Sequence, residues 1–570
     1  MDCEGLAKAW LAAAFEAVVP GCGGGKVVPS KDSRFGDWQC NDAMGIAKRA
    51  GKNPREVAQA VVQALPLPEI LEKAEVAGPG FINLTLSRKA VAAGVEALAA
   101  DPKLGVAQRG AGEKVVIDYS SPNVAKPMHI GHIRSTVIGN AIDRILRALG
   151  YEVIADNHLG DWGTQFGILI MGYRAFLTDE ERANLTVELL EKVYVQSYGR
   201  TKDDPAWLDR CREELVKLQA GDAENRAVWE RFIEISIKEF GRIYARLGVK
   251  FDLYRGESYY QPTLGPTVEA LRAQGLATQS EGAWIVDLKD EGLEVAIVQK
   301  RDGGFNYTTT DIATVKSRVE EFAPARIIYV TDERQQLHFK QFFHICGKLG
   351  LCGKTLLQHV WFGLMRLPEG TFSTRQGNVI KLETLLDEAA ARARKIVDES
   401  HPDWPEAERA ALAEAIGIGA IKYADLSHDP TTMIVFTWDK ALALEGNSGP
   451  YLQYANARLN SLLEKYRTTV GKEPDAQPLA LGTEAEKALA LHLLQFPNAV
   501  QRAGDLCKPS VLADYLYQLS QLYSSFYQSS PVLKAESEAV RDSRIRLCSA
   551  VSKVLRGGLT LLGIPTPERI

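Results

Sequence analysis

The sequence predicts an α/β protein whose core is a doubly wound parallel sheet, with a small α/β domain before it and an all-α helical bundle after it. The first observation is that short apolar segments alternate with amphipathic ones, as in 115–119 followed by 128–149, which is the pattern of strand–helix–strand units. The second is that the first hundred residues mix helical spacing with a Gly-bounded strand pattern. The third is that the chain is helical in character from about residue 383 to its end. Together these observations predict a Rossmann-type central domain between two smaller ones.

Composition narrows the class of protein. With 570 residues, the chain has room for about three or four domains. Hydrophobic residues make up 46% and charged residues 24%, which excludes a disordered chain. The net charge of −5 excludes a general polyanion-coating protein, so a nucleic-acid partner would need a local basic stripe. The 8 cysteines include no C-x-x-C pair, so neither a disulfide framework nor a zinc ribbon is predicted.

The sequence also predicts where the protein works. No apolar run reaches the roughly 18 residues that a membrane span needs. Asp2 and Glu4 stand where a secretory signal would carry positive charge, and Glu16 interrupts the apolar stretch that follows. We therefore expect a cytoplasmic protein with no membrane partner.

Residues 1–108 are expected to form the first domain. Its opening helix is indicated by apolar residues that share one face, Leu11, Ala14, Phe15, Val18 and Val19. A second helix is expected over 41–65, where the only breaker is at Gly51–Pro54, and 78–86 is expected to be a turn that leads into a strand.

Residues 109–395 are expected to form the sheet domain. Strand 115–119 and helix 128–149 are followed by Gly150, which favours a helix end, and by a second strand over 151–159. The same alternation returns later, with expected elements at 326–332 (strand), 335–350 (helix) and 359–367 (strand). Between them, 174–250 is charged and helical and 251–300 alternates like strands, which indicates an insertion at about 174–300. Residues 396–570 are expected to form the helical domain.

The segment 118–132 carries the clearest sign of chemistry. It follows a strand and runs into a helix start, the place where doubly wound sheets bind ligands. His129 and His132 are three residues apart in the first turn, where exposed N–H groups favour anions, and Gly131 lets a flat ligand approach the backbone. Lys126 adds a positive charge. This arrangement suits a nucleoside triphosphate, although a lone H-x-G-H would more often be an ordinary helix start.

Several blocks of the chain resemble one family. SSPNVAKPMHIGHIRST and NHLGDWGTQFG are similar to the signature block of class I aminoacyl-tRNA synthetases, specifically the arginyl-tRNA synthetases. Segments 37–58 and 80–83 resemble the N-terminal domain of that family, which contacts the tRNA elbow. Segments 446–458 and 555–570 resemble its helical anticodon-binding domain. The resemblance covers nearly the whole chain, in the order of the family.

The residues and the resemblance together predict a pocket for arginine. Tyr307 and Asp311 are four residues apart and share a face if their segment opens a helix. A buried carboxylate beside an aromatic ring suits a guanidinium, although a single acidic residue is more often solvated or salt-bridged. The resemblance implies arginine contacts at Asp118, Asn123, Tyr307, Asp311 and Gln335, and ATP contacts at His129 and His132. Such a pocket should reject uncharged amino acids without editing.

The second ATP-binding signature departs from the family pattern. Class I synthetases carry a K-M-S-K-S loop whose lysines stabilise the departing pyrophosphate, but residues 371–378 read TFSTRQGN. Neither lysine position holds lysine, so we expect Arg375 first and Lys126 second to supply the cation. The resemblance implies further ATP contacts at Gly363, Ser373 and Thr374. The alternative is an ordinary Gly-containing surface loop.

Two groups of residues are expected to contact RNA. Tyr451, Tyr454, Asn456 and Arg458 lie on a predicted helix, where aromatic faces and a guanidinium can stack on splayed anticodon bases. Phe81 and Asn83 are expected to contact a base of the D-loop. The alternative for each tyrosine is ordinary packing in a helix bundle.

The function expected from the resemblance is ATP-dependent ligation of L-arginine to tRNA(Arg) through arginyl-adenylate. We expect Mg²⁺ to arrive with ATP, because the sequence has no dedicated metal cage, and we expect a monomer. The resemblance also implies that tRNA must bind before arginine is activated. Two alternatives remain: a class I synthetase for another amino acid or a related nucleotidylyltransferase, and a non-catalytic RNA-binding protein that kept the fold.

Overall fold

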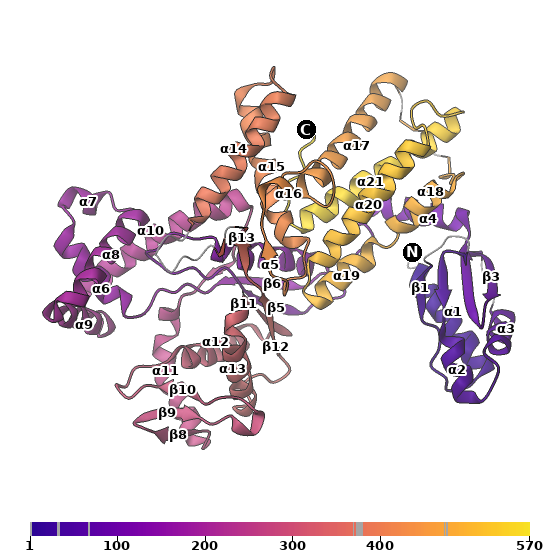
Figure 1. Cartoon of the computed structure of the whole chain (residues 1–570). Coiled ribbons are helices and arrows are strands. Elements are labelled where there is room, and N and C mark those ends of the chain that lie inside the picture. The colour runs from indigo at the N-terminus through magenta and orange to yellow at the C-terminus, as the bar shows by residue number, and fades with distance from the viewer. Residues whose placement is uncertain are drawn as a thin grey trace.

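The structure is a computed structural model that describes residues 3–30, 35–65, 69–368, 370–371, 380–471, 473–474 and 477–570. The molecule is elongated, with a small N-terminal domain at one end and a cluster of inserted helices at the other (Figure 1). A parallel sheet lies between them, and helices of the C-terminal part bridge this sheet and the N-terminal domain. The predicted fold class is confirmed.

The N-terminal domain packs three helices on a small antiparallel sheet. Its strands run in the order β1-β2-β4-β3. Its elements are α1 (Cys3–Val18), β1 (Val27–Pro29), β2 (Trp38–Cys40), α2 (Asp42–Ala50), α3 (Pro54–Ala64), β3 (Leu71–Ala77), β4 (Phe81–Leu86) and the connecting helix α4 (Arg88–Ala100). The single helix expected over 41–65 is two helices. Gly51 ends the first with φ 65°, and the Asn53 side chain caps the second, which has Pro54 in its first turn.

The central sheet is parallel, with strand order β12-β11-β5-β6-β7. Its strands are β5 (Lys114–Asp118), β6 (Glu152–Asn157), β7 (Leu253–Tyr254), β11 (Arg326–Asp332) and β12 (Leu356–Phe362). Helices α5 (Gly131–Ala148), α12 (Tyr307–Phe322) and α13 (Gln336–Lys348) belong to the same domain. The chain leaves β5 toward β6 and β7 on one side and later adds β11 and β12 on the other. The order therefore reverses between β5 and β11, where sheets of this type hold their ligands.

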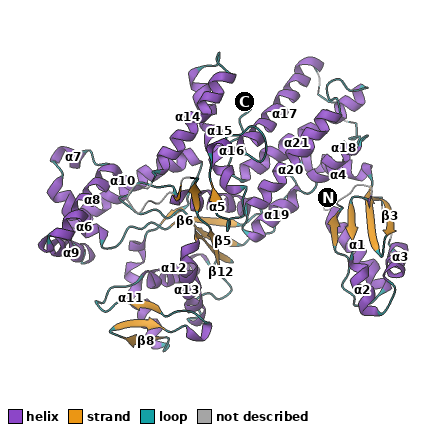
Figure 2. Ribbon diagram, viewed as in Figure 1, coloured by secondary structure: helices purple, strands orange, loops and turns teal. Residues whose placement is uncertain are grey.

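Two different pieces separate β6 from α12. Helices α6 (Gln165–Phe176), α7 (Asp179–Ala183), α8 (Val187–Asp203), α9 (Pro205–Gln219) and α10 (Ala223–Leu247) form the helical cluster. Helix α11 (Glu257–Ala273) and strands β8 (Ala277–Ser280), β9 (Ala283–Val286) and β10 (Ala296–Gln299) follow β7. These strands form a separate antiparallel sheet, visible at the bottom of Figure 2.

The strand-like reading of 251–300 is therefore wrong over α11. This helix tolerates Pro262 and Pro266 because one of its faces is buried, through Tyr260, Leu264, Thr267, Val268 and Leu271. That spacing follows the helical period, so burial outweighs the prolines. The expected strand 359–367 is also interrupted: it ends at Phe362, and Met365–Leu367 forms the separate strand β13.

The C-terminal part is helical except for one short strand. Its helices are α14 (Leu382–Ser400), α15 (Glu406–Leu426), α16 (Trp438–Ala441), α17 (Gly449–Val470), α18 (Glu484–Leu493), α19 (Phe496–Leu506), α20 (Ser510–Ser529) and α21 (Glu538–Leu561). Strand β15 (Ile434–Val435) pairs in parallel with β13, which also pairs with β14 (Gly370–Thr371). The small sheet thus connects the C-terminal part to the sheet domain.

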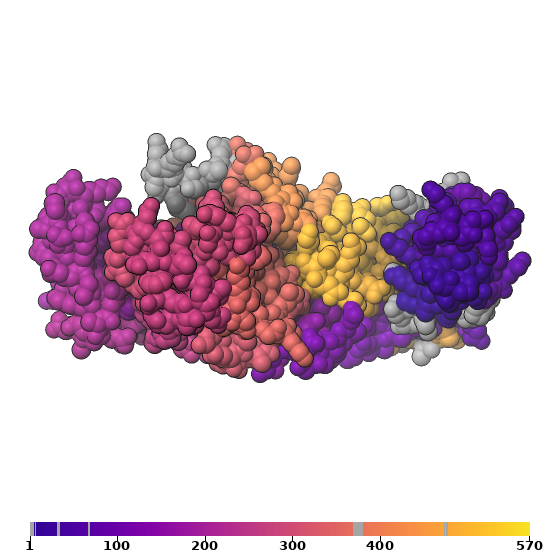
Figure 3. Space-filling view, turned by 90° about the horizontal axis from the view of Figure 1, so that it is seen from below, coloured from indigo at the N-terminus to yellow at the C-terminus, as the bar shows by residue number. Residues whose placement is uncertain are grey.

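Buried and partly buried polar contacts hold the domains together. The N-terminal domain and the C-terminal helices abut in Figure 3. Between these two parts of the chain, the Lys487 ammonium lies 2.9 Å from the Asp37 carboxylate. The Lys422 ammonium is fully buried and donates to the carbonyls of Leu247 and Gly563, at 2.7 and 2.5 Å. It thereby joins the C-terminal ends of α10 and α21, where helix dipoles favour a cation.

Candidate active site

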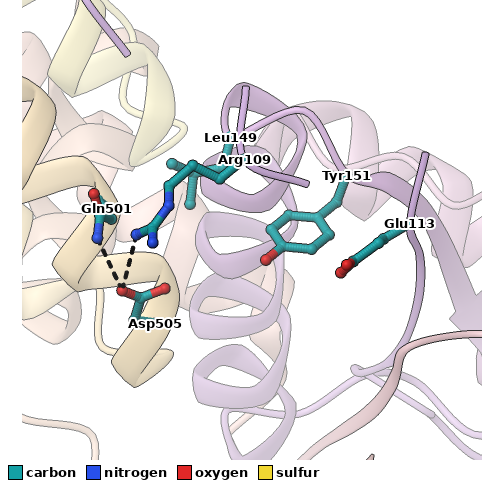
Figure 4. A pocket seen from close by; sticks show the side chains of 6 residues that line it. All are labelled: Arg109, Glu113, Leu149, Tyr151, Gln501 and Asp505. Atoms are coloured by element: carbon teal, nitrogen blue, oxygen red, sulfur yellow. Dashed lines mark hydrogen bonds and ion pairs between the residues drawn. The ribbon is translucent and has the colours of Figure 1, made fainter. Parts of the chain in front are cut away.

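The candidate site lies at the carboxyl ends of the central strands. Asp118 ends β5 and Asn157 ends β6, and α5 begins after the loop that follows β5. A hollow of about 220 Å³ lies at the opposite ends of the same strands (Figure 4). Glu113 and Tyr151, which precede β5 and β6, line it together with Arg109 and Asp505. Because ligands of such sheets bind at the carboxyl ends, that hollow is not the candidate site.

The structure brings the two histidines of the predicted nucleotide site together. The centroids of the His129 and His132 rings are 3.9 Å apart. The backbone N–H of His129 donates to Nδ1 of His132, and the backbone N–H of Gly131 donates to Nδ1 of His129, each at 3.1 Å. Since each Nδ1 accepts a hydrogen bond, the proton of each neutral ring is on Nε2. Both rings therefore offer one Nε2–H donor.

The electrostatics of this pair keep both rings neutral. The pKa of His132 is lowered to about 3, mainly by burial and also by the neighbouring His129. Burial also lowers the pKa of His129, as do the charges of Lys126 and Arg334. At pH 7 the two imidazoles can donate hydrogen bonds to phosphate oxygens but carry no positive charge.

Gly131 and Lys126 complete this part of the site. A Cβ atom on Gly131 would lie 2.8 Å from Cε1 and 2.9 Å from Nδ1 of His129. Glycine is thus needed here to leave the His129 ring in place, in addition to any access it gives a ligand. The Lys126 ammonium lies over the Tyr194 ring, 4.8 Å from its centroid. Tyr194 belongs to α8, so the lysine contacts the helical cluster.

Asp118 is held by an arginine of the chain itself. Its carboxylate is buried, with Oδ2 accepting from Nη2 of Arg318 at 2.6 Å and Oδ1 accepting from the Ser121 hydroxyl at 3.0 Å. Arg318 also donates to Asp156, at 2.8 Å. Sequence reasoning missed Arg318, although it lies seven residues after Asp311 and so on the same side of α12. Both oxygens of Asp118 therefore already have partners.

The other predicted carboxylate has a different environment. Oδ2 of Asp311 lies 2.5 Å from Nε2 of His338, and the Tyr307 ring meets the His338 ring edge-on, with centroids 4.6 Å apart. Tyr307 is 61% exposed. Asp118 and Asp311 both raise the pKa of the buried Tyr329, after the larger effect of burial. This shared influence places both carboxylates near Tyr329.

Asn123 and Gln335 lie at the border of this region. Both are exposed. Asn123 forms a parallel bridge with Gly160, and a Cβ atom on that glycine would lie 2.1 Å from the Asn123 Oδ1 atom. Gln335 ends the short 3₁₀ helix that follows β11. Each amide is thus accessible to a ligand.

Further polar groups of this region were missed from the sequence. The pKa of Glu257 is raised to about 7, mainly by burial and also by Asp161 and Asp311, against the opposing effect of His158. Several buried polar atoms make no hydrogen bond to the described residues: Asp156 Oδ1, His158 Nδ1, Tyr260 hydroxyl, Arg318 Nη1, Tyr329 hydroxyl and His338 Nδ1. Unsatisfied groups are rare in protein interiors, so their concentration here marks a region that a polar ligand or water completes.

The remaining expected ATP contacts fall in two classes. Gly363 is buried and its backbone is engaged: its N–H donates to the Pro430 carbonyl at 3.0 Å, and its carbonyl accepts from Arg134 at 2.6 Å. Ser373, Thr374 and Arg375 lie outside the described residues. Within the described ranges, no group of three or more His, Cys, Asp or Glu side chains is arranged to hold a metal ion.

The expected RNA-contacting residues also divide. Tyr454 is 42% exposed, and the Arg458 guanidinium lies over the Tyr527 ring, 4.5 Å from its centroid. The Tyr451 hydroxyl accepts a hydrogen bond from Gln521 at 3.2 Å. One face of α17 and α20 is therefore aromatic and basic. Asn456 is fully buried and does not reach this face. In the N-terminal domain, Asn83 is buried and its Oδ1 accepts from Gln39 at 2.9 Å, whereas Phe81 is half-buried.

Three family profiles match consecutive parts of the chain. Residues 95–438 match the catalytic domain of class I tRNA synthetases (R), residues 11–86 match the arginyl tRNA synthetase N-terminal domain, and residues 452–570 match the DALR anticodon-binding domain. The chain belongs to the arginyl-tRNA synthetase family. Among the described helices, none has the length and apolar character needed to cross a membrane.

Full-length relatives support this membership. The chain is 46% identical over 543 residues to the arginine–tRNA ligase of Fusobacterium nucleatum, covering 95% of this chain and 94% of that protein. It is 42% identical over 580 residues to the arginine–tRNA ligase of Vibrio vulnificus, covering all of both. The crystal structure of arginyl-tRNA synthetase from Plasmodium falciparum superposes with a TM-score of 0.86 at 28% identity, covering 100% of this chain and 99% of that one. The Thermus thermophilus arginyl-tRNA synthetase superposes with a TM-score of 0.83 at 26% identity, covering 100% of both chains.

Proposed function

We propose that the chain ligates L-arginine to tRNA(Arg) in two ATP-dependent steps, through an arginyl-adenylate intermediate. The observation that carries this proposal is the neutral His129–His132 pair, which presents two Nε2–H donors at the start of α5, after the carboxyl end of β5. Such donors stabilise developing phosphate charge without acting as nucleophiles.

In the first step the arginine carboxylate attacks the α-phosphorus of ATP in line, and pyrophosphate leaves. The protein positions the two substrates and neutralises charge, since it supplies no covalent intermediate. His129 and His132 donate to phosphate oxygens. Arg375 and Lys126 are the candidate cations for pyrophosphate, and Lys126 would have to leave the Tyr194 ring to reach it. Mg²⁺ comes bound to ATP.

Arginine recognition centres on Asp311. Its carboxylate pairs with the guanidinium, Tyr307 covers the planar group, and the exposed amides of Asn123 and Gln335 contact the remaining polar atoms. Asp118 contributes through Arg318, which fixes the end of β5 beside the pocket.

In the second step the 2′-hydroxyl of the terminal tRNA ribose attacks the carbonyl carbon of arginyl-adenylate, so that the arginyl ester forms, the anhydride bond breaks and AMP leaves. Tyr451, Tyr454 and Arg458 form the stacking face for anticodon bases, and the half-buried Phe81 is the candidate for a D-loop base. Asn456 and Asn83 support these surfaces from inside, because both are buried. Binding of tRNA precedes arginine activation; pyrophosphate exchange at full rate without tRNA would contradict this order.

The organisation of the chain follows from these roles. We assign residues 1–108 to the elbow-contacting domain, 109–395 to the catalytic domain and 396–570 to the helical domain that contacts the stem and anticodon. The enzyme acts as a monomer in the cytoplasm. Sedimentation of the purified chain and fractionation of cells test these two statements.

The test of the function is arginylation of unfractionated tRNA by the purified protein with ATP and Mg²⁺, comparing wild type with Asp311→Ala. We expect charging by the wild type with arginine alone among the amino acids, and near-complete loss in the folded variant. Charging with another amino acid would assign a different synthetase. tRNA binding by folded wild type without any charging would favour a non-catalytic RNA-binding protein.

A further inference from the structure

Among the contacts of the described residues, Asp311 has a carboxylate oxygen without a hydrogen bond, whereas Asp118 has none. Both oxygens of Asp118 accept hydrogen bonds, from Arg318 and Ser121. Asp311 is bonded through Oδ2 to His338, and its Oδ1 accepts no hydrogen bond from the part of the chain that the structure describes. A guanidinium can therefore be received at Asp311 without displacing an internal partner, and the orientation of this carboxylate depends on His338.

His338 is itself held firmly. It lies in the first turn of α13, and its side chain is only 15% exposed. Its ring meets the Tyr307 ring edge-on, with centroids 4.6 Å apart, and its centroid lies 5.1 Å from that of the Phe342 ring. Packing between rings restricts the imidazole, so the 2.5 Å contact from Nε2 fixes the position of Oδ2 of Asp311.

His338 donates from Nε2 in its contact with Asp311, because a carboxylate oxygen can only accept. Its Nδ1 atom is buried and has no hydrogen-bond partner among the described residues. Among those residues, the imidazole nitrogens therefore bond to Asp311 alone, and this bond leaves Oδ1 of the carboxylate for a substrate.

We propose that His338 is a positioning residue for arginine: its imidazole donates from Nε2 to Oδ2 of Asp311 and so presents Oδ1 to the substrate guanidinium. The role explains why an imidazole serves here, where a lysine or arginine would compete with the substrate. This inference rests on the proposed assignment of Asp311 as the guanidinium partner.

The test compares two amide substitutions of similar polarity. In His338→Gln the side-chain amide reaches about as far as Nε2, and in His338→Asn only about as far as Nδ1. We measure the KM values for arginine and ATP and kcat in steady-state aminoacylation. For His338→Asn we expect the arginine KM to rise about tenfold or more, because a hydrogen bond to a charged group is lost, with the ATP KM and kcat within about threefold of wild type. For His338→Gln we expect an arginine KM within about threefold of wild type.

The proposal is overturned if both variants raise the arginine KM equally, if neither does, or if the ATP KM rises in parallel. A double substitution provides the second measurement: in an Asp311→Asn background, His338→Asn should change the arginine KM by less than about twofold, since its partner is already altered. Independent losses in the double variant would also overturn it. Failure of the wild type to charge arginine would instead contradict the proposed function.

Discussion

Two buried arginines of this molecule have opposite environments. Arg134, 2% exposed, uses all three guanidinium nitrogens: it donates to Asp425 and to the carbonyls of Gly363, Thr432 and Pro430. Arg318, 0% exposed, donates to Asp118 and Asp156, but its Nη1 has no partner among the described residues.

The difference in hydrogen bonding distinguishes a structural contact between elements, at Arg134, from a functional site, at Arg318. The fully satisfied Arg134 ties α5 to α15 and to the loop before β15. Around Arg318, buried atoms of Asp156, Tyr260 and Tyr329 have no hydrogen-bond partner in the part of the chain that the structure describes. Complete polar networks fix one packing, whereas incomplete ones leave free energy for a ligand or water to recover.

The largest effect on stability should come from removing the fully hydrogen-bonded Arg134. Arg134→Met leaves the buried Asp425 carboxylate without its partner, and we expect the free energy of unfolding to fall by about 3–5 kcal/mol. Urea denaturation followed by circular dichroism measures this. The double variant Arg134→Met/Asp425→Leu should recover a large part of the loss, because no buried charge then remains. An Arg134→Met variant as stable as the wild type would show that this contact does not hold the domains together.

In the candidate site, in contrast, we expect a substitution of a buried ionisable group to increase the stability of the protein. Burial raises the pKa of Glu257 to about 7, above the roughly 4.3 of an exposed glutamate. Between these values the folded state binds more protons than the unfolded state, so stability falls as pH rises from about 4.5 to 7. Glu257→Gln cannot ionise, and we expect it to be about 1–3 kcal/mol more stable than wild type at pH 8 and equal to it near pH 4.

Denaturation of both proteins at the two pH values measures this prediction. A stability difference that does not change with pH would mean that Glu257 ionises as an exposed carboxyl does. Greater stability with lower activity in the Gln variant would show directly that this region gives up stability for function.

A smaller effect is expected at the helix start. Gly131→Ala places a methyl group 2.8 Å from the His129 ring, which must then move from the position that presents its Nε2–H. We expect kcat/KM for ATP to fall about tenfold, or about 1.4 kcal/mol. The arginine KM should stay near wild type, and initial rates at varied ATP and arginine separate the two. An equal change in both would instead indicate a disturbed fold at α5.

The sequence predicts those features whose cause is local. Strand β11 coincides with the expected 326–332. His129 precedes α5, which begins at Gly131, but its backbone N–H bonds to His132 and the two rings lie together. The helix α11 was readable from its buried face but was obscured by two prolines. In each case the deciding interactions lie within a few residues of each other.

Partners that come from distant parts of the chain could not be predicted in this way. Asp118 looks like a free substrate ligand in the sequence, yet its partner Arg318 lies 200 residues away. His338 is likewise 27 residues from Asp311 and on another helix. Asn83 and Asn456 carry groups suited to RNA, but only the packing of the sheet and of the helices decides that they face inward.

The smallest predicted effect is that of a substitution on the proposed RNA-binding face of α17 and α20. Tyr454 is 42% exposed on α17, one turn before Arg458. Arg134, in contrast, is only 2% exposed. Tyr454→Ala should leave the free energy of unfolding within about 0.5 kcal/mol of wild type, because an exposed ring contributes little to the core. Loss of one stacked base should weaken tRNA binding by about 1 kcal/mol, or roughly fivefold. The KM for tRNA should rise by that factor while the KM values for arginine and ATP stay constant; an unchanged tRNA KM would remove Tyr454 from the RNA-binding face and leave Tyr451 and Arg458 to account for it.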